Sequence, residues 1–397
     1  MLFRSNAKPP TEIPDFSNLD DYIYVPKSVL STGLRMLSGA KMSFSGKGRL
    51  ATTEDSGLLS ATNVRRAYHD GSVNFDTRAV TRLDADGNPV TDPVTGVTLT
   101  DPIAPDGRTN SWNYLSNKQQ AADGSLAFNN YTADIVDPAV RSTKGTRNSG
   151  LELAVSRDMG KLFNSRATWV ISGGMSVNDL SAKTSSNVLA NLTTLTDLYS
   201  LNGQPLPDSP YTSPSTSSFS VTDPNGAPVL NPDGSAQTVT TDTSTLISNQ
   251  PTSRNTRTAS DSGSVTNHWR VHGAYYTFRA GPTIFVPITT RFRASLSLGA
   301  ALVYAGSTYT VMQSFLPDTG AEISDTSENT TSKLLPGYYA DASIQFDLTE
   351  RAGFYAGAVF QSTGAYTQNV NTTSAQYSSR VDLANRSGMR AGMTIRF

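Results

Sequence analysis

The stretch SGMRAGMTIRF, residues 387–397, ends the chain with a strict alternation of residue types. Met389, Ala391, Met393, Ile395 and Phe397 are apolar, and every residue between them is polar or small. A period of two is typical of a β-strand with one apolar and one polar face. Terminal residues usually fray in water, so this pattern predicts a last strand that is held in a sheet with its apolar face covered.

The same period of two recurs upstream in seven further segments. They lie at about 33–47, 150–156, 166–175, 267–287, 291–306, 338–348 and 352–360. The phase of the alternation shifts near Gly273, which predicts a β-bulge at that glycine. Counted with the C-terminal stretch, the pattern predicts eight strands.

Short and long connections alternate between these segments. Tight turns such as LTER (348–351) and PITT (287–290) alternate with long polar connections at about 48–148, 179–266, 313–333 and 369–380. This asymmetry is typical of a transmembrane β-barrel with short periplasmic turns and long extracellular loops. An even number of strands puts both termini on the periplasmic side. A soluble β-sandwich or β-solenoid is the alternative, but its strands usually have five or six residues.

The strand lengths suit a bilayer. The twelve steps from Phe292 to Tyr304 span roughly 40 Å and rise about 30 Å at a tilt of about 40°, enough to cross an apolar band about 25 Å tall. Two aromatic girdles are expected, one of Phe292, Phe346, Phe354 and Phe397 and one of Phe44, Tyr304 and Tyr338. The predicted fold class is therefore all-β, a transmembrane antiparallel up-and-down barrel. Its domains are an N-terminal periplasmic extension at 1–32 and the barrel with its long loops at 33–397.

Composition limits the function classes. The chain has 397 residues, 37% of them hydrophobic, and a net charge of -1, which argues against nucleic acid as a partner. No apolar run approaches the length of about 18 residues that a membrane helix needs. The N-terminal segment also lacks the apolar core of a signal peptide, which conflicts with export.

The last eight residues, RAGMTIRF, resemble the C-terminal assembly signal of bacterial outer-membrane β-barrels. The matching positions are Arg390, Gly392, Ile395 and Phe397. The layout of residues 33–397 is similar to small single-chain barrels of the surface-protein and opacity-protein type, from which the chain departs in its very long first and second outer loops. The resemblance implies a bacterial outer-membrane location, contact with outer-membrane lipid, and recognition by the barrel-assembly machinery through the last strand.

Charged residues occupy many positions that this register turns inward. The expected lumen-facing charges are Arg35, Lys41, Glu152, Asp158, Arg166, Arg279, Arg291, Arg293, Asp341, Asp347, Arg380, Asp382, Arg386, Arg390 and Arg396. A cation-lined pore for anions is one interpretation. A closed, salt-bridged interior is the other, and it is favoured because eight strands leave a lumen that side chains fill and unpaired buried charges are costly.

Other candidate sites are weaker. The only histidines are His69, His268 and His272, and without a matching Ser or Asp they predict no catalytic site. DADGN (84–88) has the first spacings of a calcium loop, but Pro89 replaces the required glycine, so a turn is expected. It shares the pattern D-x-x-G-x-P-V-x-[DN]-P with 223–232, and each copy predicts a small hairpin.

Two assignments of structure remain open. Residues 186–199 fit a weak helix or a strand extension equally well. Residues 71–78 and 109–117 would raise the strand count to ten if both crossed the membrane, and rim or extracellular structure is preferred.

The predicted function is a structural or surface-display barrel with a closed lumen and long polar loops for an unknown extracellular ligand. A passive porin-like channel for small hydrophilic solutes, including anions, is the alternative. Neither hypothesis includes enzymatic activity, a metal or a cofactor.

Overall fold

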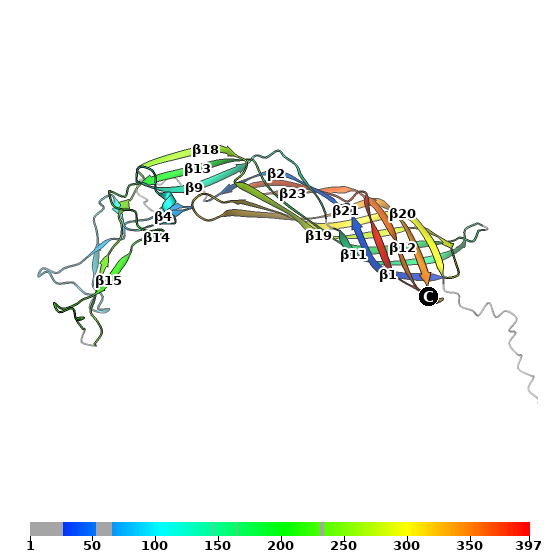
Figure 1. The fold of residues 1–397 in the computed structure, drawn as a ribbon, viewed down its shortest axis with the longest axis horizontal. Helices are drawn as coiled ribbons and strands as arrows, with labels where there is room; N and C mark the ends of the chain where they lie inside the picture. Colours follow the sequence, from blue (N-terminus) through cyan, green and yellow to red (C-terminus); the bar gives the residue numbers. More distant parts are fainter. Residues whose placement is uncertain (1–26, 53–65, 146, 164, 231–233) are drawn as a thin grey trace, which may run out of the picture.

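The molecule is elongated in the computed structural model, which describes residues 27–52, 66–145, 147–163, 165–230 and 234–397. A barrel that contains the C-terminus lies at one end, a second sheet lies beyond it, and small sheets and hairpins form the other end (Figure 1). The predicted all-β, antiparallel class is confirmed. Among the described residues, the 3-10 turn η2 (Asn117–Gln119) is the only helical element, and no helix is long and apolar enough to cross a membrane.

In the described part of the chain, eight strands close into a ring in which each is hydrogen-bonded to the next. In ring order they are β1 (Ser28–Ser38), β11 (Asn148–Lys161), β12 (Thr168–Asn187), β19 (Val265–Pro287), β20 (Phe292–Phe315), β21 (Ile323–Asp347), β22 (Ala352–Thr363) and β25 (Arg386–Arg396). The ring closes where β1 pairs antiparallel with β25, Gly33 opposite Gly392. The repetitive C-terminal stretch is thus held in a sheet, as its pattern predicts, and β1 begins at Ser28 rather than at the expected residue 33.

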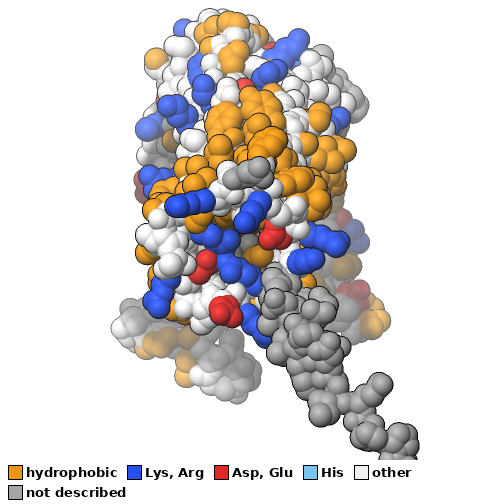
Figure 2. Space-filling view, turned by 90° about the vertical axis from the view of Figure 1, so that its right-hand side faces the viewer, with side chains coloured by type: hydrophobic (Ala, Val, Ile, Leu, Met, Phe, Trp, Pro, Cys, Tyr) orange, Lys and Arg blue, Asp and Glu red, His pale blue; other side chains and the backbone are white. Residues whose placement is uncertain are grey.

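Outward and inward positions of the ring differ in chemistry. Outward side chains such as Leu298, Ile344 and Met389 are apolar and more than half exposed. Figure 2 faces the barrel end and shows hydrophobic side chains covering a broad area, with Lys and Arg beside Asp and Glu at its lower border. Inward side chains of the same strands are polar and buried, including Ser176, Thr277 and Gln345. This arrangement reverses that of a water-soluble barrel.

Four ring strands continue far past the barrel. β12, β19, β20 and β21 have between 20 and 25 residues, which corresponds to roughly 65–80 Å of strand. A second sheet lies beside this extension and contains β18 (Ser253–Asp261), β13 (Ala190–Tyr199), β9 (Leu126–Ile135), β2 (Lys41–Ala51), β24 (Ala375–Asp382) and β23 (Ala365–Asn371), with β10 (Arg141–Lys144) also paired to β2. Segments expected to be long polar loops therefore contain several strands, among them β9, β13 and β18.

An apolar core fills the space between the extension and the second sheet. Phe44 of β2 is fully buried there and stacks on Trp269 and Tyr309, with ring centroids 6.0 and 5.8 Å apart. Its expected place in an aromatic girdle was wrong, because β2 leaves the ring. The exposed aromatics Tyr304 and Phe292 do lie on the outer wall, and Phe292 contacts Phe346 across strands at 5.0 Å.

The predicted bulge at Gly273 is absent. Gly273 pairs with Leu180 and Ser307 in registers that run without a shift. What changes at this glycine is the chemistry of the inward face, because Trp269 on one side of it is buried in the apolar core and Arg279 on the other is buried in the polar lumen. An exchange of apolar and polar positions in one unbroken register looks in sequence like a slip of one residue.

The far end of the molecule has its own small core. Trp112, Tyr114, Phe128 and Tyr199 are buried together there. The strands at this end are β3 (Arg66–Tyr68), β4 (Gly71–Val73), β8 (Trp112–Tyr114) and β14 (Tyr211–Thr212), with the pairs β5 (Ala79–Thr81) and β6 (Thr100–Pro102), β7 (Arg108–Thr109) and β17 (Ile247–Ser248), and β15 (Thr216–Ser220) and β16 (Thr238–Asp242). β4 and β8 pair with each other outside the ring, so residues 71–78 and 109–117 do not extend it.

Other expectations are resolved locally. Residues 186–199 form the end of β12 and the strand β13, so the strand alternative is correct and the helix is wrong. Beta branching and asparagine disfavour a helix, and pairing with β9 and β18 stabilises the strand. The expected extension at 1–32 falls mainly on residues 1–26, which lie outside the described residues.

Candidate functional site

The centre of the lumen holds a cross-linked group of four charged side chains, which we call the central ion-pair layer: Glu152, Arg279, Asp341 and Arg390. Arg279 contacts Glu152 at 2.9 Å and Asp341 at 3.1 Å. Arg390 contacts the same two carboxylates at 3.1 and 3.2 Å. The four residues come from β11, β19, β21 and β25, so this layer ties together strands from around the ring.

Two further layers of arginine lie along the lumen on either side. On the side nearer the second sheet, Arg35 donates to Ser176 at 3.0 Å and to Gln361 at 2.6 Å. Arg386 lies 4.6 Å over the ring of Tyr275. On the side nearer the tight turns, Asp347 forms ion pairs with Arg293 at 3.1 Å and with Arg396 at 2.7 Å.

A small polar cavity lies between the central ion-pair layer and the layer around Asp347. Its volume is about 60 Å³, and hydroxyl groups line much of it, including those of Ser172, Thr283 and Ser297. A cavity of this size holds no more than a few water molecules. Side chains therefore occupy the lumen in three layers, as the small radius of an eight-stranded ring requires.

The structure places the fifteen expected lumen charges in three groups. Nine of them are buried or half-buried inside the ring: Arg35, Glu152, Arg279, Arg293, Asp341, Asp347, Arg386, Arg390 and Arg396. Three lie on the second sheet instead, namely Lys41, Arg380 and Asp382. Asp158, Arg166 and Arg291 are exposed at or near the turn end of the ring.

Two backbone positions explain the residues that were wrongly placed in the lumen. The chain leaves the ring at Gly39, whose φ is +99°, and re-enters it after Asn385, whose φ is +53°. Lys41 and Asp382 follow and precede these bends and are cross-strand partners in the second sheet. A period of two runs through both bends, so the alternation in the sequence did not reveal them.

The histidines do not form a shared site. His69 contacts the carbonyl oxygen of Ala321 through Nε2 at 2.7 Å, whereas His268 and His272 point outward from β19. No cluster of three or more His, Asp or Glu suited to a metal occurs among the described residues. The carboxylate of Asp84 accepts backbone N–H groups of Asp86 and Asn88 at 3.0 and 2.8 Å, which makes a turn of its loop, as predicted.

The two related hairpins adopt the same backbone arrangement. Asp84 N–H donates to the carbonyl of Asn88 at 2.9 Å, and Asp223 N–H donates to that of Ala227 at 2.8 Å. Gly87 and Gly226 both have φ of +83°, a conformation that glycine adopts readily. The shared sequence pattern thus encodes a shared turn.

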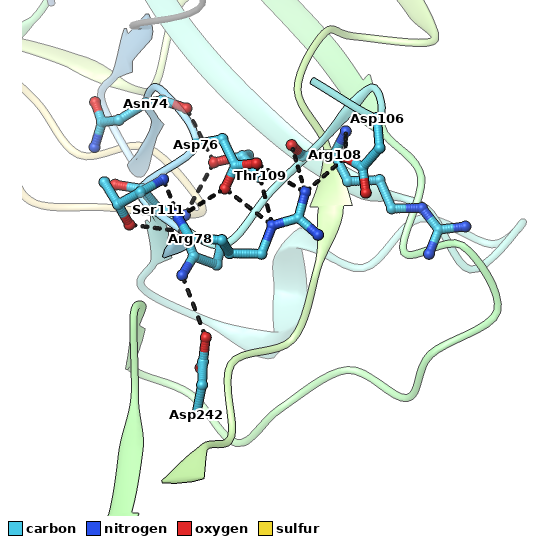
Figure 3. Close-up of polar contacts among 10 residues, drawn as sticks. Asn74, Asp76, Arg78, Asp106, Arg108, Thr109, Ser111 and Asp242 are labelled. Atoms are coloured by element: carbon cyan, nitrogen blue, oxygen red, sulfur yellow. Dashed lines mark hydrogen bonds and ion pairs between the residues drawn. The ribbon is translucent and has the colours of Figure 1, made fainter. Parts of the chain in front are cut away.

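Sequence reasoning missed the polar networks near these hairpins. Arg78 donates to Asp76 at 2.8 Å and to Asp106 at 2.6 Å, and it fixes the segment that leads into β5 (Figure 3). On the second sheet itself, Asp197 of β13 is fully buried and accepts from both Arg254 and the hydroxyl of Tyr68. Burial raises the pKa of the Tyr68 phenol, so it acts as a donor at neutral pH.

Comparisons with known proteins give a weak likeness. No protein-family model matches the chain, and no curated protein matches it. Among solved structures, it is similar to the outer membrane protease OmpT from Escherichia coli, at 9% identity and a TM-score of 0.28, covering 94% of this chain and 97% of that one. It is also similar to a FadL homologue from Pseudomonas aeruginosa, at 8% identity and a TM-score of 0.19, covering 94% and 90%. At these TM-scores neither likeness assigns an activity to this chain.

Proposed function

We propose that this chain is a bacterial outer-membrane protein whose barrel is a closed anchor and whose outer sheets display a polar surface to an extracellular ligand. The observation that carries the proposal is the exchange of apolar and polar faces at Gly273 within one register. Outward positions are mostly apolar on the barrel part of these strands and mostly polar beyond it. Such a wall is stable against lipid and unstable against water.

The contents of the lumen favour an anchor over a pore. The central ion-pair layer has its charges within 2.9–3.2 Å of each other, and arginine layers flank it on both sides. Opening a passage would separate desolvated charges, which is costly for each pair that is broken.

The distal part supports display. Its hairpins stand at the end of the molecule farthest from the barrel (Figure 1), and polar networks such as Arg78 with Asp76 and Asp106 hold them in place. A rigid scaffold that positions loops far from the membrane is typical of recognition surfaces. We infer that the C-terminal strand also serves as the signal for the barrel-assembly machinery.

Planar-bilayer recording tests the closed lumen. The folded wild-type protein, with insertion verified by protease protection of its barrel strands, is expected to give no steady conductance. A matched variant in which Glu152, Arg279, Asp341 and Arg390 are all serine removes the central layer and is expected to conduct more than the wild type. Steady conductance from the wild type would contradict the anchor.

Surface labelling tests the display. An epitope inserted after Gly226 should be labelled on intact cells, whereas the same epitope inserted after Glu350 should be labelled only after permeabilisation. The reverse pattern would contradict the proposed orientation.

A porin-like function is the second candidate, and one observation favours it. The lumen holds six arginines, at 35, 279, 293, 386, 390 and 396, against the three carboxylates at 152, 341 and 347. A lumen with this excess of positive charge would select anions if it opened. The same recordings, in asymmetric salt, distinguish the two functions.

A further inference from the structure

A shallow groove lies on the outer wall of the strand extension, away from the lumen and the distal tip. It runs across β12, β19 and β20 and reaches β21. Its lining includes the cations Lys183 and Arg270, the outward hydroxyl groups of Ser185, Thr310 and Thr326, and Met312, and none of the lining residues is acidic.

Lys183 and Arg270 lie close enough for their positive charges to repel each other. Lys183 of β12 and Arg270 of β19 are direct cross-strand partners, a position in which like charges destabilise a sheet. Among the described residues, no carboxylate lies within ion-pair distance of either, although the exposed Arg49 and the half-buried Arg141 each pair with an aspartate. A bound anion between the two side chains would remove this repulsion.

The height of the groove restricts the source of that anion. Arg270 and Tyr276 point outward from the same strand, six residues apart, and Tyr276 is at the end of the apolar wall, opposite Tyr304. Six residues span roughly 20 Å of strand and rise about 15 Å at a typical tilt. The polar region of an ordinary phospholipid leaflet is only about 5–8 Å deep, so its headgroups would lie below the groove.

We propose that this groove binds the phosphorylated sugar headgroup of a large glycolipid in the outer leaflet. Arg270 would hold a phosphate through two parallel N–H donors, and Lys183 would act as a point charge on the same group. Thr310 would bond to sugar hydroxyls, and Met312, which is partly exposed, would pack on a sugar face. This inference rests on the proposed membrane insertion.

The test measures lipid binding to the full-length protein after folding. The protein is folded in phosphatidylcholine nanodiscs that contain rough lipopolysaccharide, and insertion is scored separately by protease protection of the barrel strands. The wild type is expected to bind lipopolysaccharide, and the double variant Lys183→Gln with Arg270→Gln is expected to bind roughly tenfold more weakly. The matched control, Lys47→Gln with Arg257→Gln, removes two exposed cations from the second sheet and should bind like the wild type.

Binding measurements with other ligands identify the chemical group that the groove recognises. Dephosphorylated lipopolysaccharide and phosphatidylglycerol should bind to the wild type as weakly as lipopolysaccharide binds to the double variant. Free inorganic phosphate at millimolar concentration should not compete. Equal binding by the double variant, or full competition by free phosphate, would overturn the glycolipid assignment while insertion remained intact. Loss of barrel protection in every sample would instead refute the membrane proposal and this inference with it.

Discussion

Glu152 shows how much one side chain contributes to the closed lumen. It contacts Arg279 and Arg390 and also accepts from the hydroxyl of Tyr355 at 3.1 Å. Its side chain is fully buried, so water cannot replace these contacts if the carboxylate is lost. Removing one member of a buried ion pair leaves the partner charges without compensation, which costs more than the pair itself contributes.

Replacing Glu152 by Gln is therefore expected to lower the free energy of unfolding by about 3 kcal/mol. Asp158→Asn is the matched control, because Asp158 is an exposed carboxylate of the same strand, and its cost should stay within about 0.5 kcal/mol. Urea unfolding in phosphatidylcholine vesicles measures both. Equal stability of the two variants would show that the central layer does not stabilise the barrel.

Asp70 makes stability depend on pH in the part of the molecule beyond the barrel, which consists of the second sheet and the small sheets and is called the outer part below. It is fully buried and accepts from Asn129 N–H and Nδ2, each at 2.7 Å, and from Thr319 at 2.8 Å. Burial raises the pKa of this carboxyl. Between the ordinary carboxyl value of about 4 and the raised one, the folded state keeps a proton that the unfolded state releases, so stability falls as pH rises.

Aspartates with lowered pKa values, such as Asp84 and Asp101, are ionised in both states above about pH 4.5. Between that pH and the raised pKa of Asp70, unfolding of the outer part should thus need less urea as the pH rises, with tryptophan fluorescence as the readout because Trp112 and Trp269 are buried there. Asp70→Asn should flatten this slope, whereas the exposed-turn variant Asp86→Asn should keep it. An unchanged slope in Asp70→Asn would assign the pH dependence to other groups.

At the scale of the element, the joint between β1 and β25 depends on glycine. Gly33 and Gly392 are cross-strand partners where the ring closes. A Cβ atom on Gly33 would lie 2.3 Å from the carbonyl oxygen of Ala391 and 2.6 Å from the hydroxyl of Tyr355. That hydroxyl also contacts Glu152, so any shift of Tyr355 would disturb the central ion-pair layer.

Gly33→Ala is expected to destabilise the closed ring by about 1–3 kcal/mol through overpacking. Gly173→Ala in β12 is the matched control, because a Cβ atom there would have nothing within 4 Å. The free energy of unfolding in phosphatidylcholine vesicles and the fraction of chains that fold should both be lower for Gly33→Ala and unchanged for Gly173→Ala. A Gly33→Ala protein as stable as Gly173→Ala would mean that the joint has room for a side chain.

At the scale of the whole molecule, the long strands have different surroundings in the barrel and beyond it. In the barrel the strands turn apolar residues outward and polar residues inward, and beyond Gly273 they enclose an apolar core with a second sheet. In the proposed membrane insertion, the level of the membrane is set by where the outward face changes from apolar to polar.

Arginine substitutions at two outward positions test this level. Leu298→Arg lies in the middle of the apolar wall, where its side chain is 61% exposed, and it should reduce the free energy of insertion by about 2–4 kcal/mol. Thr330→Arg lies on the neighbouring strand beyond the wall and should cost less than about 1 kcal/mol. The insertion equilibrium in vesicles, measured by urea titration, gives both values, and equal costs would place the wall outside the bilayer.

The sequence by itself determined the strands of the ring and which of their residues face outward. Alternation is a local property of the chain, so the segment that contains Ile395 and Phe397 could be identified without knowing its partners. The same is true of the turn at Asp84, whose carboxylate bonds to its own loop. The expected pairing of lumen charges also followed from a general argument, the small radius of the ring.

Only the tertiary structure decided where strands leave the ring and what they pack against. Phe44 and Lys41 continue the alternation of β1, yet a bend at Gly39 carries them into the second sheet. The apolar core around Trp269 exists because β2 and β24 cover it, and these segments are far from β19 in sequence. A period of two states only that a strand has two unlike faces; whether lipid, water or another sheet covers each face depends on contacts between distant residues.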